Sequence, residues 1–254
     1  MKNSPSYTVH PQYSNWIAKT GLVRSLGKFL RNYIPFGRVS YSQEGEDMVL
    51  ARIFEMLEVS NGFFVDIGAH HPTRYSNTYF FYRRGWRGIN VDALPGTERL
   101  FTRMRPRDIT IECGIGTKTG LLTYYSFNEP ALNTFSESEA ERKNHSPYCI
   151  VETIQIQIKT LQKILDEHLP PDTGIDFLTI DVEGLDHEVV MSNDWSKYRP
   201  KVILVEMLAS DLSKMNDHPT AQLLGGNGYH LIAKTHNTYF FVEAQSLLQL
   251  NKPA

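Results

Sequence analysis

A short apolar stretch that ends in an acid and a small-residue turn constrains this chain more than any other feature. Residues 62–72 read Gly-Phe-Phe-Val-Asp-Ile-Gly-Ala-His-His-Pro, and residues 63–66 have the composition of a short buried strand. Gly68 and Ala69 permit a tight turn after it, and a helix can begin near Ser76. A strand, a small-residue turn and a helix form the usual cradle for a nucleotide-like ligand, because the helix N-terminus offers free amide donors.

A second predicted strand also ends in an acid. Residues 88–92 read Gly-Ile-Asn-Val-Asp, and an acid at the position of Asp92 can accept hydrogen bonds from both hydroxyls of an adenosine ribose. The glycine pattern alone is a weak signal, since only Gly68 stands where a dinucleotide fingerprint has three glycines. The nucleotide prediction therefore rests more on the two strand-end acids, Asp66 and Asp92, than on the glycine.

Strands and helices alternate along the rest of the chain. Further strands are predicted at residues 109–113, 121–127, 152–158, 177–181, 202–206, 229–233 and 238–242, and helices at 48–57, 75–82, 95–104, 161–168 and 185–191. Strict alternation of apolar and polar residues predicts that strand 152–158 is antiparallel and half-exposed. Residues 128–149 are predicted to form a long loop, and long loops tend to be functional.

Strands interleaved with helices predict a mostly parallel sheet that helices cover on both faces. The short turn at residues 236–237 makes the last two strands antiparallel to each other. We therefore predict an α/β fold with a seven-stranded, mostly parallel Rossmann-like sheet, an antiparallel last strand and an N-terminal helical extension.

Composition and charge narrow the possible partners. The 254 residues suffice for a full α/β core, and a net charge of −2 gives no electrostatic reason to expect nucleic acid. Cys113 and Cys149 have no metal-type spacing, and we expect them to be reduced, although a disulfide between them stays open. No secretory signal pattern and no run of about 18 apolar residues is present. We expect a cytoplasmic protein without a membrane span.

Residues 16–34 form an amphipathic pattern within the predicted N-terminal extension, residues 1–40. Apolar residues recur at helical spacing, and the basic residues lie mostly off that stripe: Lys19, Arg24, Lys28 and Arg31. Such a helix can lie on an anionic membrane surface or bind a partner. We favour the simpler prediction that it packs on its own domain, since most amphipathic helices do only that.

Residues 41–47, Tyr-Ser-Gln-Glu-Gly-Glu-Asp, precede the predicted helix 48–57. Ser42 suits a helix N-cap, and three acids that include Asp47 suit the positive end of the helix dipole. A plain helix start does not explain Gln43 or Gly45, so this segment is a candidate for function as well as structure.

Four acids follow predicted strands of the sheet, at the edge where open α/β sheets bind ligands: Asp66, Asp92, Asp181 and Glu206. One such acid is as often a helix cap or turn former, but four at one edge are less easily explained that way. Glu183 and Asp186 enlarge the group. The acids could hold Mg²⁺ or Ca²⁺, with Asp181, Glu183 and Glu206 as candidate ligands, or supply a general base whose pKa is raised by like charge.

His70 and His71 follow the turn directly. A neutral imidazole is a natural base for a hydroxyl near pH 7, so either side chain is a catalytic candidate. The alternative is that one of them packs or forms hydrogen bonds within the loop. Zinc-type Cys/His spacing, a Gly-x-Ser-x-Gly elbow and a Gly-Lys-Ser/Thr phosphate loop are all absent from the sequence.

Four segments together resemble the FkbM-type family of S-adenosylmethionine-dependent methyltransferases: residues 42–47, residues 64–69 with Ser76, residues 90–92 and residues 180–184. The resemblance covers about residues 41–242. Its most characteristic part is the Asp-x-Glu-Gly of residues 181–184. The family implies a Rossmann-like class I methyltransferase fold and methyl transfer, usually to a sugar or polyketide hydroxyl.

The resemblance also implies roles by position. Asp66 and Gly68 would form the cofactor turn, Asp92 would hold the ribose, and Asp181 and Glu183 would face the reacting centre. The predicted cofactor-binding set is completed by Gln43, Asp47, Ala69, Ser76, Ala93, Cys113 and Gly114. His70 and His71 depart from the small polar residue and glycine found in many members, and Gln162 stands where members often have Asp.

The sequence thus predicts that residues 41–254 form an S-adenosylmethionine-dependent O-methyltransferase that acts on a hydroxyl of a small molecule, carbohydrate or glycoconjugate, with Mg²⁺ as an open question. One alternative is a nicotinamide-dependent oxidoreductase, against which the single Gly68 argues. Another is a non-catalytic membrane-associated binding protein, which the basic helix at 16–34 favours and the four retained acids oppose. The acceptor, the methylated position and the oligomeric state stay open.

Overall fold

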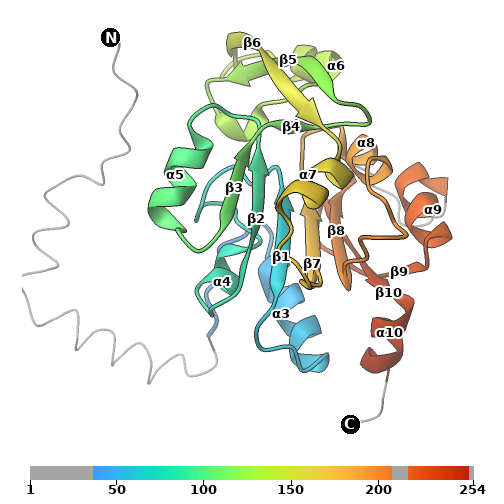
Figure 1. Ribbon diagram of the computed structural model, residues 1–254. Coiled ribbons are helices and arrows are strands. Elements are labelled where there is room, and N and C mark those ends of the chain that lie inside the picture. Colours follow the sequence, from blue (N-terminus) through green and yellow to red (C-terminus); the bar gives the residue numbers. More distant parts are fainter. Residues whose placement is uncertain (1–36, 208–216, 252–254) are drawn as a thin grey trace, which may run out of the picture. The chain divides into compact units, whose positions relative to one another are not determined.

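A seven-stranded sheet forms the centre of the computed structural model, which describes residues 37–207 and 217–251 (Figure 1). Its strands are β1 (Phe63–Ile67), β2 (Arg87–Asp92), β3 (Ile109–Glu112), β7 (Phe177–Ile180), β8 (Val202–Glu206), β9 (Tyr229–Lys234) and β10 (Thr238–Glu243). They lie in the order β3-β2-β1-β7-β8-β10-β9. The first five strands pair in parallel, and β10 is antiparallel to both β8 and β9. The predicted α/β fold is confirmed.

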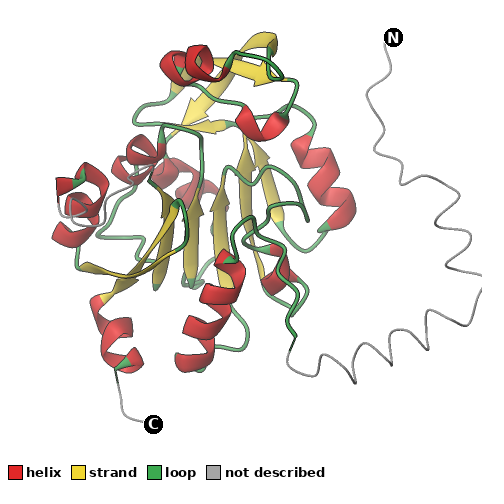
Figure 2. Cartoon of the chain, turned by 180° about the vertical axis from the view of Figure 1, so that it is seen from behind, coloured by secondary structure: helices red, strands yellow, loops and turns green. Residues whose placement is uncertain are grey.

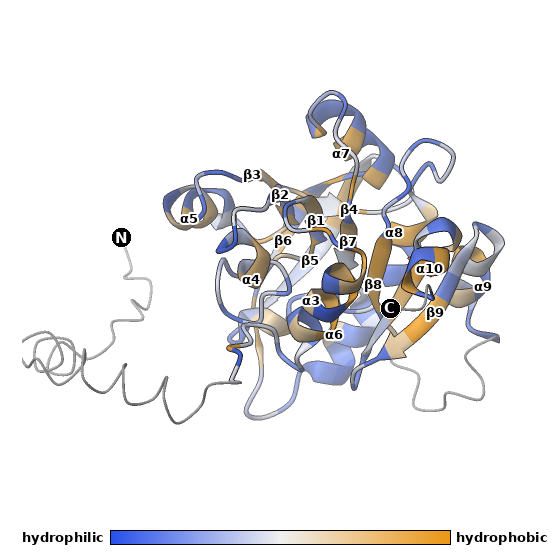
Figure 3. Ribbon diagram, turned by 90° about the horizontal axis from the view of Figure 1, so that it is seen from below, coloured by the Kyte–Doolittle hydropathy of each residue, from blue (hydrophilic) through white to orange (hydrophobic). Residues whose placement is uncertain are grey.

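Helices cover both faces of this sheet (Figure 2). On one face, the side chains of β1 and β7 pack with α7 (Leu161–His168), α8 (Asp186–Met191) and α9 (Pro219–Gly226). On the other face, a second core includes α3 (Glu46–Met56) and α4 (Tyr79–Tyr82), with α10 (Ala244–Leu250) at its margin. Because central parallel strands are buried on both faces, β1 is apolar at every position except its acid, Asp66. Figure 3 shows hydrophobic residues on β8, whereas α5 (Thr97–Met104) and α7 carry both hydrophilic and hydrophobic residues, as amphipathic helices on the surface of a sheet do.

The order of the strands creates a switch point between β1 and β7. From β1 the chain proceeds outward through β2 to β3, and it later returns to the other side of β1 as β7. Neighbouring connections then leave the sheet in opposite directions, which opens a crevice at the carboxyl ends of the strands. The predicted site residues of β1, β2 and β7 belong to this edge.

A smaller sheet lies beyond that edge. It consists of β4 (Gly114–Ile115), β6 (Ile150–Lys159) and β5 (Gly120–Phe127), in the order β4-β6-β5. The pairing of β5 with β6 is antiparallel over its length, and the outer side chains of β6 are exposed. The prediction of a half-exposed antiparallel strand at residues 152–158 is therefore confirmed.

The prediction of a long loop at residues 128–149 is wrong in part. A 3-10 turn, η1 (Pro130–Leu132), and a helix, α6 (Glu137–Lys143), lie within it. The Ser136 hydroxyl accepts a hydrogen bond from the Glu139 amide, acids occupy the first turn and bases the last. Capping and charge define this helix, and an apolar stripe does not, so hydrophobic periodicity could not find it.

The helix predicted at residues 75–82 is shorter in the structure, where α4 begins at Tyr79. The amphipathic pattern at 16–34 lies outside the described residues, and the division into residues 1–40 and 41–254 stays a prediction. Within the described ranges, no helix combines the length and apolar character that crossing a membrane requires.

Candidate active site

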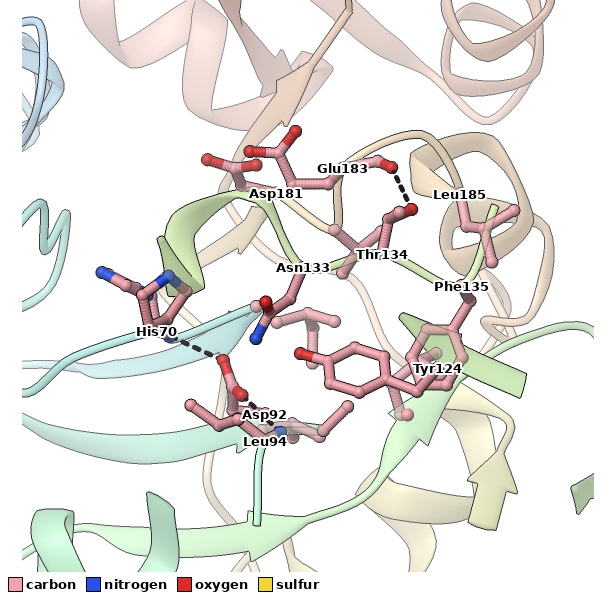
Figure 4. Close-up of a pocket in the computed structure, with 18 of the residues that line it drawn as sticks. His70, Asp92, Leu94, Tyr124, Asn133, Thr134, Phe135, Asp181, Glu183 and Leu185 are labelled. Atoms are coloured by element: carbon pink, nitrogen blue, oxygen red, sulfur yellow. Dashed lines mark hydrogen bonds between the residues drawn. The ribbon is translucent and has the colours of Figure 1, made fainter. Parts of the chain in front are cut away.

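A cavity opens at the carboxyl edge of the parallel strands. The empty space within it is about 860 Å³ when the open solvent at its mouth is included. Figure 4 shows the side chains that line it. The ends of β1, β2, β3 and β7 form its floor, and residues 130–135 with β5 supply the opposite wall. Nine of the predicted cofactor-binding and catalytic residues belong to its lining: Gln43, Gly68, His70, Asp92, Ala93, Cys113, Gly114, Asp181 and Glu183.

The turn after β1 is fixed by backbone contacts. Gly68 has a φ of 83°, and a Cβ atom at this position would lie 1.7 Å from the carbonyl oxygen of Asp181. The amides of Gly68 and Ala69 both donate to the Val91 carbonyl, at 2.9 and 3.1 Å. Only glycine fits a left-handed position that another backbone approaches so closely.

Asp92 joins this turn to the end of β2. Its two carboxylate oxygens accept from the His70 amide at 2.7 Å and from the Leu94 amide at 2.8 Å. Burial raises the pKa of Asp92, and the two amide bonds oppose that rise. Each oxygen keeps a second lone pair, so ribose binding by Asp92 is chemically feasible and stays a prediction.

Four predicted cofactor-binding residues lie outside the cavity lining: Asp47, Asp66, Ala69 and Ser76. Asp66 accepts a hydrogen bond from the Thr78 hydroxyl at 2.8 Å, and the buried guanidinium of Arg105 donates to Thr78 at 2.9 Å. Burial raises the pKa of Asp66 to about 6. This buried network lies outside the cavity lining. Asp66 and Ser76 therefore stabilise the segment after β1 and do not line the cavity themselves.

The segment at 42–47 divides in the same way. Gln43 lines the cavity, whereas Asp47 is buried outside it and accepts from Ser40 Oγ at 2.6 Å and from the Tyr41 amide at 2.7 Å. Glu44 accepts from the Asn237 amide at 3.1 Å. The acids of this segment therefore form hydrogen bonds within residues 40–47 and to the β9–β10 turn. Gln43 is the residue of the segment that lines the cavity.

Asp181 and Glu183 come together at the end of β7, as predicted. Figure 4 shows both carboxylates on the same side of the turn that follows the strand. Asp181 is exposed to the cavity, and yet its pKa is raised well above the ordinary value, by desolvation among protein atoms and then by the charges of Glu206 and Glu183. Glu183 has a φ of 55°, an uncommon value for a residue with a side chain.

Glu206 and Asp186 lie outside the lining, close to this pair. Burial and the neighbouring carboxylates raise the pKa of Glu206 to about 8. Asp186, with a pKa raised to about 7 mainly by burial, accepts from the amides of Val182 and Gly184 and so shapes the turn. Among residues 37–207 and 217–251, no group of three or more His, Cys, Asp or Glu side chains is placed to hold a metal ion. The proposed ligation by Asp181, Glu183 and Glu206 thus gains no support from the geometry.

The two histidines differ in position. His71 lies outside the lining, and its Nδ1 accepts from the amides of Thr73 and Arg74, both at 3.1 Å, which is a role within the loop. His70 lines the cavity, and its Nε2 is buried without a hydrogen-bond partner among the described residues. Burial and Arg74 lower the pKa of His70 to about 4, so its ring is neutral at pH 7.

The wall opposite the sheet holds residues that the sequence did not reveal. Tyr124 and Phe135 add aromatic side chains to the lining there, and Asn133 and Thr134 add polar ones (Figure 4). Tyr75 adds another aromatic side chain to the lining from the segment after β1. The side-chain oxygen Oδ1 of Asn133 accepts a hydrogen bond from the Phe127 amide at 2.7 Å, which ties this wall to β5. Functional bias in long loops was the only available signal, and it pointed to the region without naming residues.

A family model described as the methyltransferase FkbM domain matches residues 66–231. This chain belongs to the FkbM family of S-adenosylmethionine-dependent methyltransferases. The resemblance drawn from the four sequence segments is thereby confirmed, and methyltransferase membership is favoured over the oxidoreductase alternative. No curated protein matches the chain.

Solved structures with a similar arrangement include two methyltransferases and a fibrillarin. A TehB-like S-adenosylmethionine-dependent methyltransferase from Corynebacterium glutamicum has 10% identity, covers 87% of this chain and 97% of its own, and gives a TM-score of 0.38. An O-methyltransferase from Bacillus cereus in complex with SAH has 12% identity, with 91% and 96% covered and a TM-score of 0.35. Aeropyrum pernix fibrillarin with natively bound S-adenosyl-L-methionine has 11% identity, with 82% and 86% covered and a TM-score of 0.39.

The residues of the cavity fit the family's cofactor. The Asp92 carboxylate lies in the lining beside the turn at Gly68, and His70 Nε2 is a buried polar atom without a hydrogen-bond partner among the described residues. None of the described lining residues is Lys or Arg, and three are acids, which suits a cationic cofactor.

Proposed function

We propose that this protein is an S-adenosylmethionine-dependent O-methyltransferase whose acceptor is a hydroxyl of an uncharged carbohydrate or glycoconjugate. The observation that carries the proposal is Asp181, a carboxylate that is exposed to the cavity and has a strongly raised pKa. A base is most effective when its pKa approaches the working pH, and a sugar hydroxyl needs such a base.

The residues have separable tasks. Asp92 and the turn at Gly68 would bind and orient the cofactor, which would supply a methyl group on a positively charged sulfur. Asp181 would accept the proton of the acceptor hydroxyl, so that the oxygen can take the methyl group as the bond from that group to sulfur breaks. Because the leaving group is already activated, alignment of the two reactants supplies most of the remaining rate enhancement.

The lining favours a neutral acceptor. Asp92, Asp181 and Glu183 are acids, His70 is neutral at pH 7, and no Lys or Arg belongs to the described lining. A phosphorylated or uronic acid acceptor would meet repulsion without a compensating cation. Carboxylates accept hydrogen bonds from hydroxyls, and rings such as Tyr75 can pack on the apolar faces of a sugar.

The test combines binding with turnover. Calorimetry should show that the purified protein binds S-adenosylhomocysteine and does not bind NAD. Transfer of labelled methyl from S-adenosylmethionine should occur to neutral oligosaccharides and should be weaker to matched uronates and sugar phosphates. Binding of NAD alone would contradict the cofactor assignment, and faster methylation of the anionic acceptors would contradict the acceptor class. Cofactor binding without transfer to any member of the panel would support the non-catalytic alternative.

Asp181→Asn tests the assigned base. The substitution preserves size and removes the charge, so kcat should fall by roughly 10²-fold with little change in S-adenosylhomocysteine affinity. Asp172→Asn is the matched control, because Asp172 is exposed and precedes the opposite end of β7. A wild-type rate in Asp181→Asn would show that the base has been misassigned.

A further inference from the structure

A buried lysine reaches the site from a helix that the proposed reaction has not used. Lys143 is the last residue of α6, and only 10% of its side chain is exposed. Its ammonium forms an ion pair with Glu183, whose side chain is 28% exposed and lines the cavity. Lysine is rarely buried unless it is paired, so this contact accounts for the position of the side chain.

Two further contacts join the same segment to the same turn. The Thr134 hydroxyl donates to the Glu183 carbonyl at 2.7 Å (Figure 4). A Cβ atom on Gly184 would lie 3.0 Å from Glu139 Cγ, so α6 packs closely against the turn. Glu183 is therefore held from α6 at its side chain and from residue 134 at its backbone.

The charges explain why the side chain of Glu183 needs such a contact. Asp181, Asp186 and Glu206 act on one another electrostatically, and Glu183 repels all three. Without a cation, the Glu183 carboxylate would gain free energy by rotating away from them, and the open direction is the cavity. The positive charge of the Lys143 ammonium offsets this repulsion. It is also close enough to Glu206 to oppose the rise in the pKa of that carboxyl group.

We propose that Lys143 is a positioning residue, which acts through Glu183 to hold the carboxylate at the catalytic turn and to dock α6 beside the cavity. This inference rests on the proposed function for its effect on turnover. Its effect on α6 is independent of catalysis, because the contacts join groups of this chain alone.

The experiment compares Lys143→Met with Lys143→Arg. Methionine keeps the apolar stem and loses the charge, whereas arginine keeps a cation that can pair with Glu183. In Lys143→Met, kcat should fall about tenfold or more while KM for S-adenosylmethionine stays within about threefold, since misplaced groups lower the rate of the chemical step. Lys143→Arg should recover most of the lost kcat. A purely structural role would lower the melting temperature without this division between kcat and KM.

Amide hydrogen exchange of the ligand-free protein supplies the second measurement. Exchange in α6 should be about tenfold faster in Lys143→Met and near wild type in Lys143→Arg, because local opening is controlled by local contacts. Arg142→Met is the matched control: Arg142 lies on the same helix, is exposed and pairs with Glu139, so its loss should change little.

The outcomes separate the two proposals. Unchanged exchange in Lys143→Met, an unchanged kcat in an active preparation, or an equal effect of Arg142→Met would overturn the role of Lys143. If wild-type protein transfers no methyl group to any acceptor while Lys143→Met still loosens α6, the docking contact is supported and the proposed function fails. A Lys143→Met protein that does not fold leaves Lys143→Arg and Glu183→Gln, and exchange in α6 must then be near wild type in the first and faster in the second.

Discussion

The two walls of the cavity are held in place by different means. The turn after β1 depends on backbone: amides of Gly68, Ala69 and His70 bond to the end of β2, and Gly68 leaves no space for a side chain. The wall at 130–143 is tied to β5 by a backbone bridge between Tyr125 and Thr134, but it reaches the turn after β7 through side chains, chiefly Thr134 and Lys143. Backbone contacts require particular residue types at fixed spacing, whereas side-chain contacts can be supplied from many positions. The residues of the first wall can therefore be predicted from the sequence, and those of the second wall cannot.

The largest expected effect is at Gly68. Gly68→Ala places a Cβ atom 1.7 Å from the Asp181 carbonyl, so the turn must move. We expect binding of S-adenosylhomocysteine to fall by about 100-fold or more, or the fold to be lost, by calorimetry and thermal unfolding. Gly85→Ala is the control, because Gly85 has a φ of 99° with no atom within 4 Å of the added Cβ. If both variants behave alike, backbone strain alone accounts for the effect and the close approach does not matter.

Asp92 should give the next largest effect. Asp92→Ala removes an acceptor for two amides and the predicted ribose ligand, and we expect cofactor affinity to weaken by about 1.5–3 kcal/mol, the range for hydrogen bonds to a charged group. Isothermal calorimetry with S-adenosylhomocysteine measures this. An unchanged dissociation constant in a folded variant would mean that neither the ribose contact nor the tie to His70 matters for binding.

The carboxylates beside the second wall should make stability depend on pH. The pKa of Glu206 is raised to about 8 in the folded protein, above its ordinary value, so the folded state holds a proton that the unfolded chain releases. Wild-type stability should therefore fall as pH rises from about 4.5 to 8. Glu206→Gln lacks this titration, and its advantage in melting temperature should grow across that window, by about 2–4 °C for each 1 kcal/mol. A constant difference at every pH would contradict the raised pKa.

The smallest effect is expected from Thr134. Thr134→Val removes the hydroxyl that bonds to the Glu183 carbonyl and keeps the shape, so stability should fall by about 0.5–1.5 kcal/mol. Thr134→Ser keeps the hydroxyl and serves as the control. Denaturant unfolding measures both, and equal stability of the two variants would show that the contact is unimportant to the second wall.

These differences explain what the sequence could predict. The parallel strands could be predicted from apolar runs that end in acids, because strands buried on both faces need such runs, and Asp66, Asp92 and Asp181 each mark a strand end. Position along a strand does not say which way a side chain is directed in three dimensions. Asp66 and Asp47 were thus expected in the cofactor site, and both lie in hydrogen-bond networks outside the lining.

The second wall shows the opposite limit. Tyr124, Asn133 and Phe135 enter the cavity because the small sheet folds back over the edge of the large one, and no local pattern encodes a contact between distant segments. Helix α6 has polar residues at nearly all its positions, so its docking through Lys143 depends on a partner that lies 40 residues away in the chain. Only the three-dimensional arrangement identifies that pair.

The hydrogen-bond network at residues 40–47 has a consequence for the boundaries of any shortened form of the protein. Glu44 bonds to the amide of Asn237, and Glu46 accepts from Thr235 at 3.2 Å and from Thr238 at 3.3 Å. Residues 40–47 are thus hydrogen-bonded to residues 235–238, near the other end of the described chain. Strand β10, which lies between β8 and β9 in the sheet, begins within that second segment. The region that identifies the family, residues 66–231, contains neither half of this seam. A fragment cut to residues 66–231 would therefore lack these hydrogen bonds and strand β10.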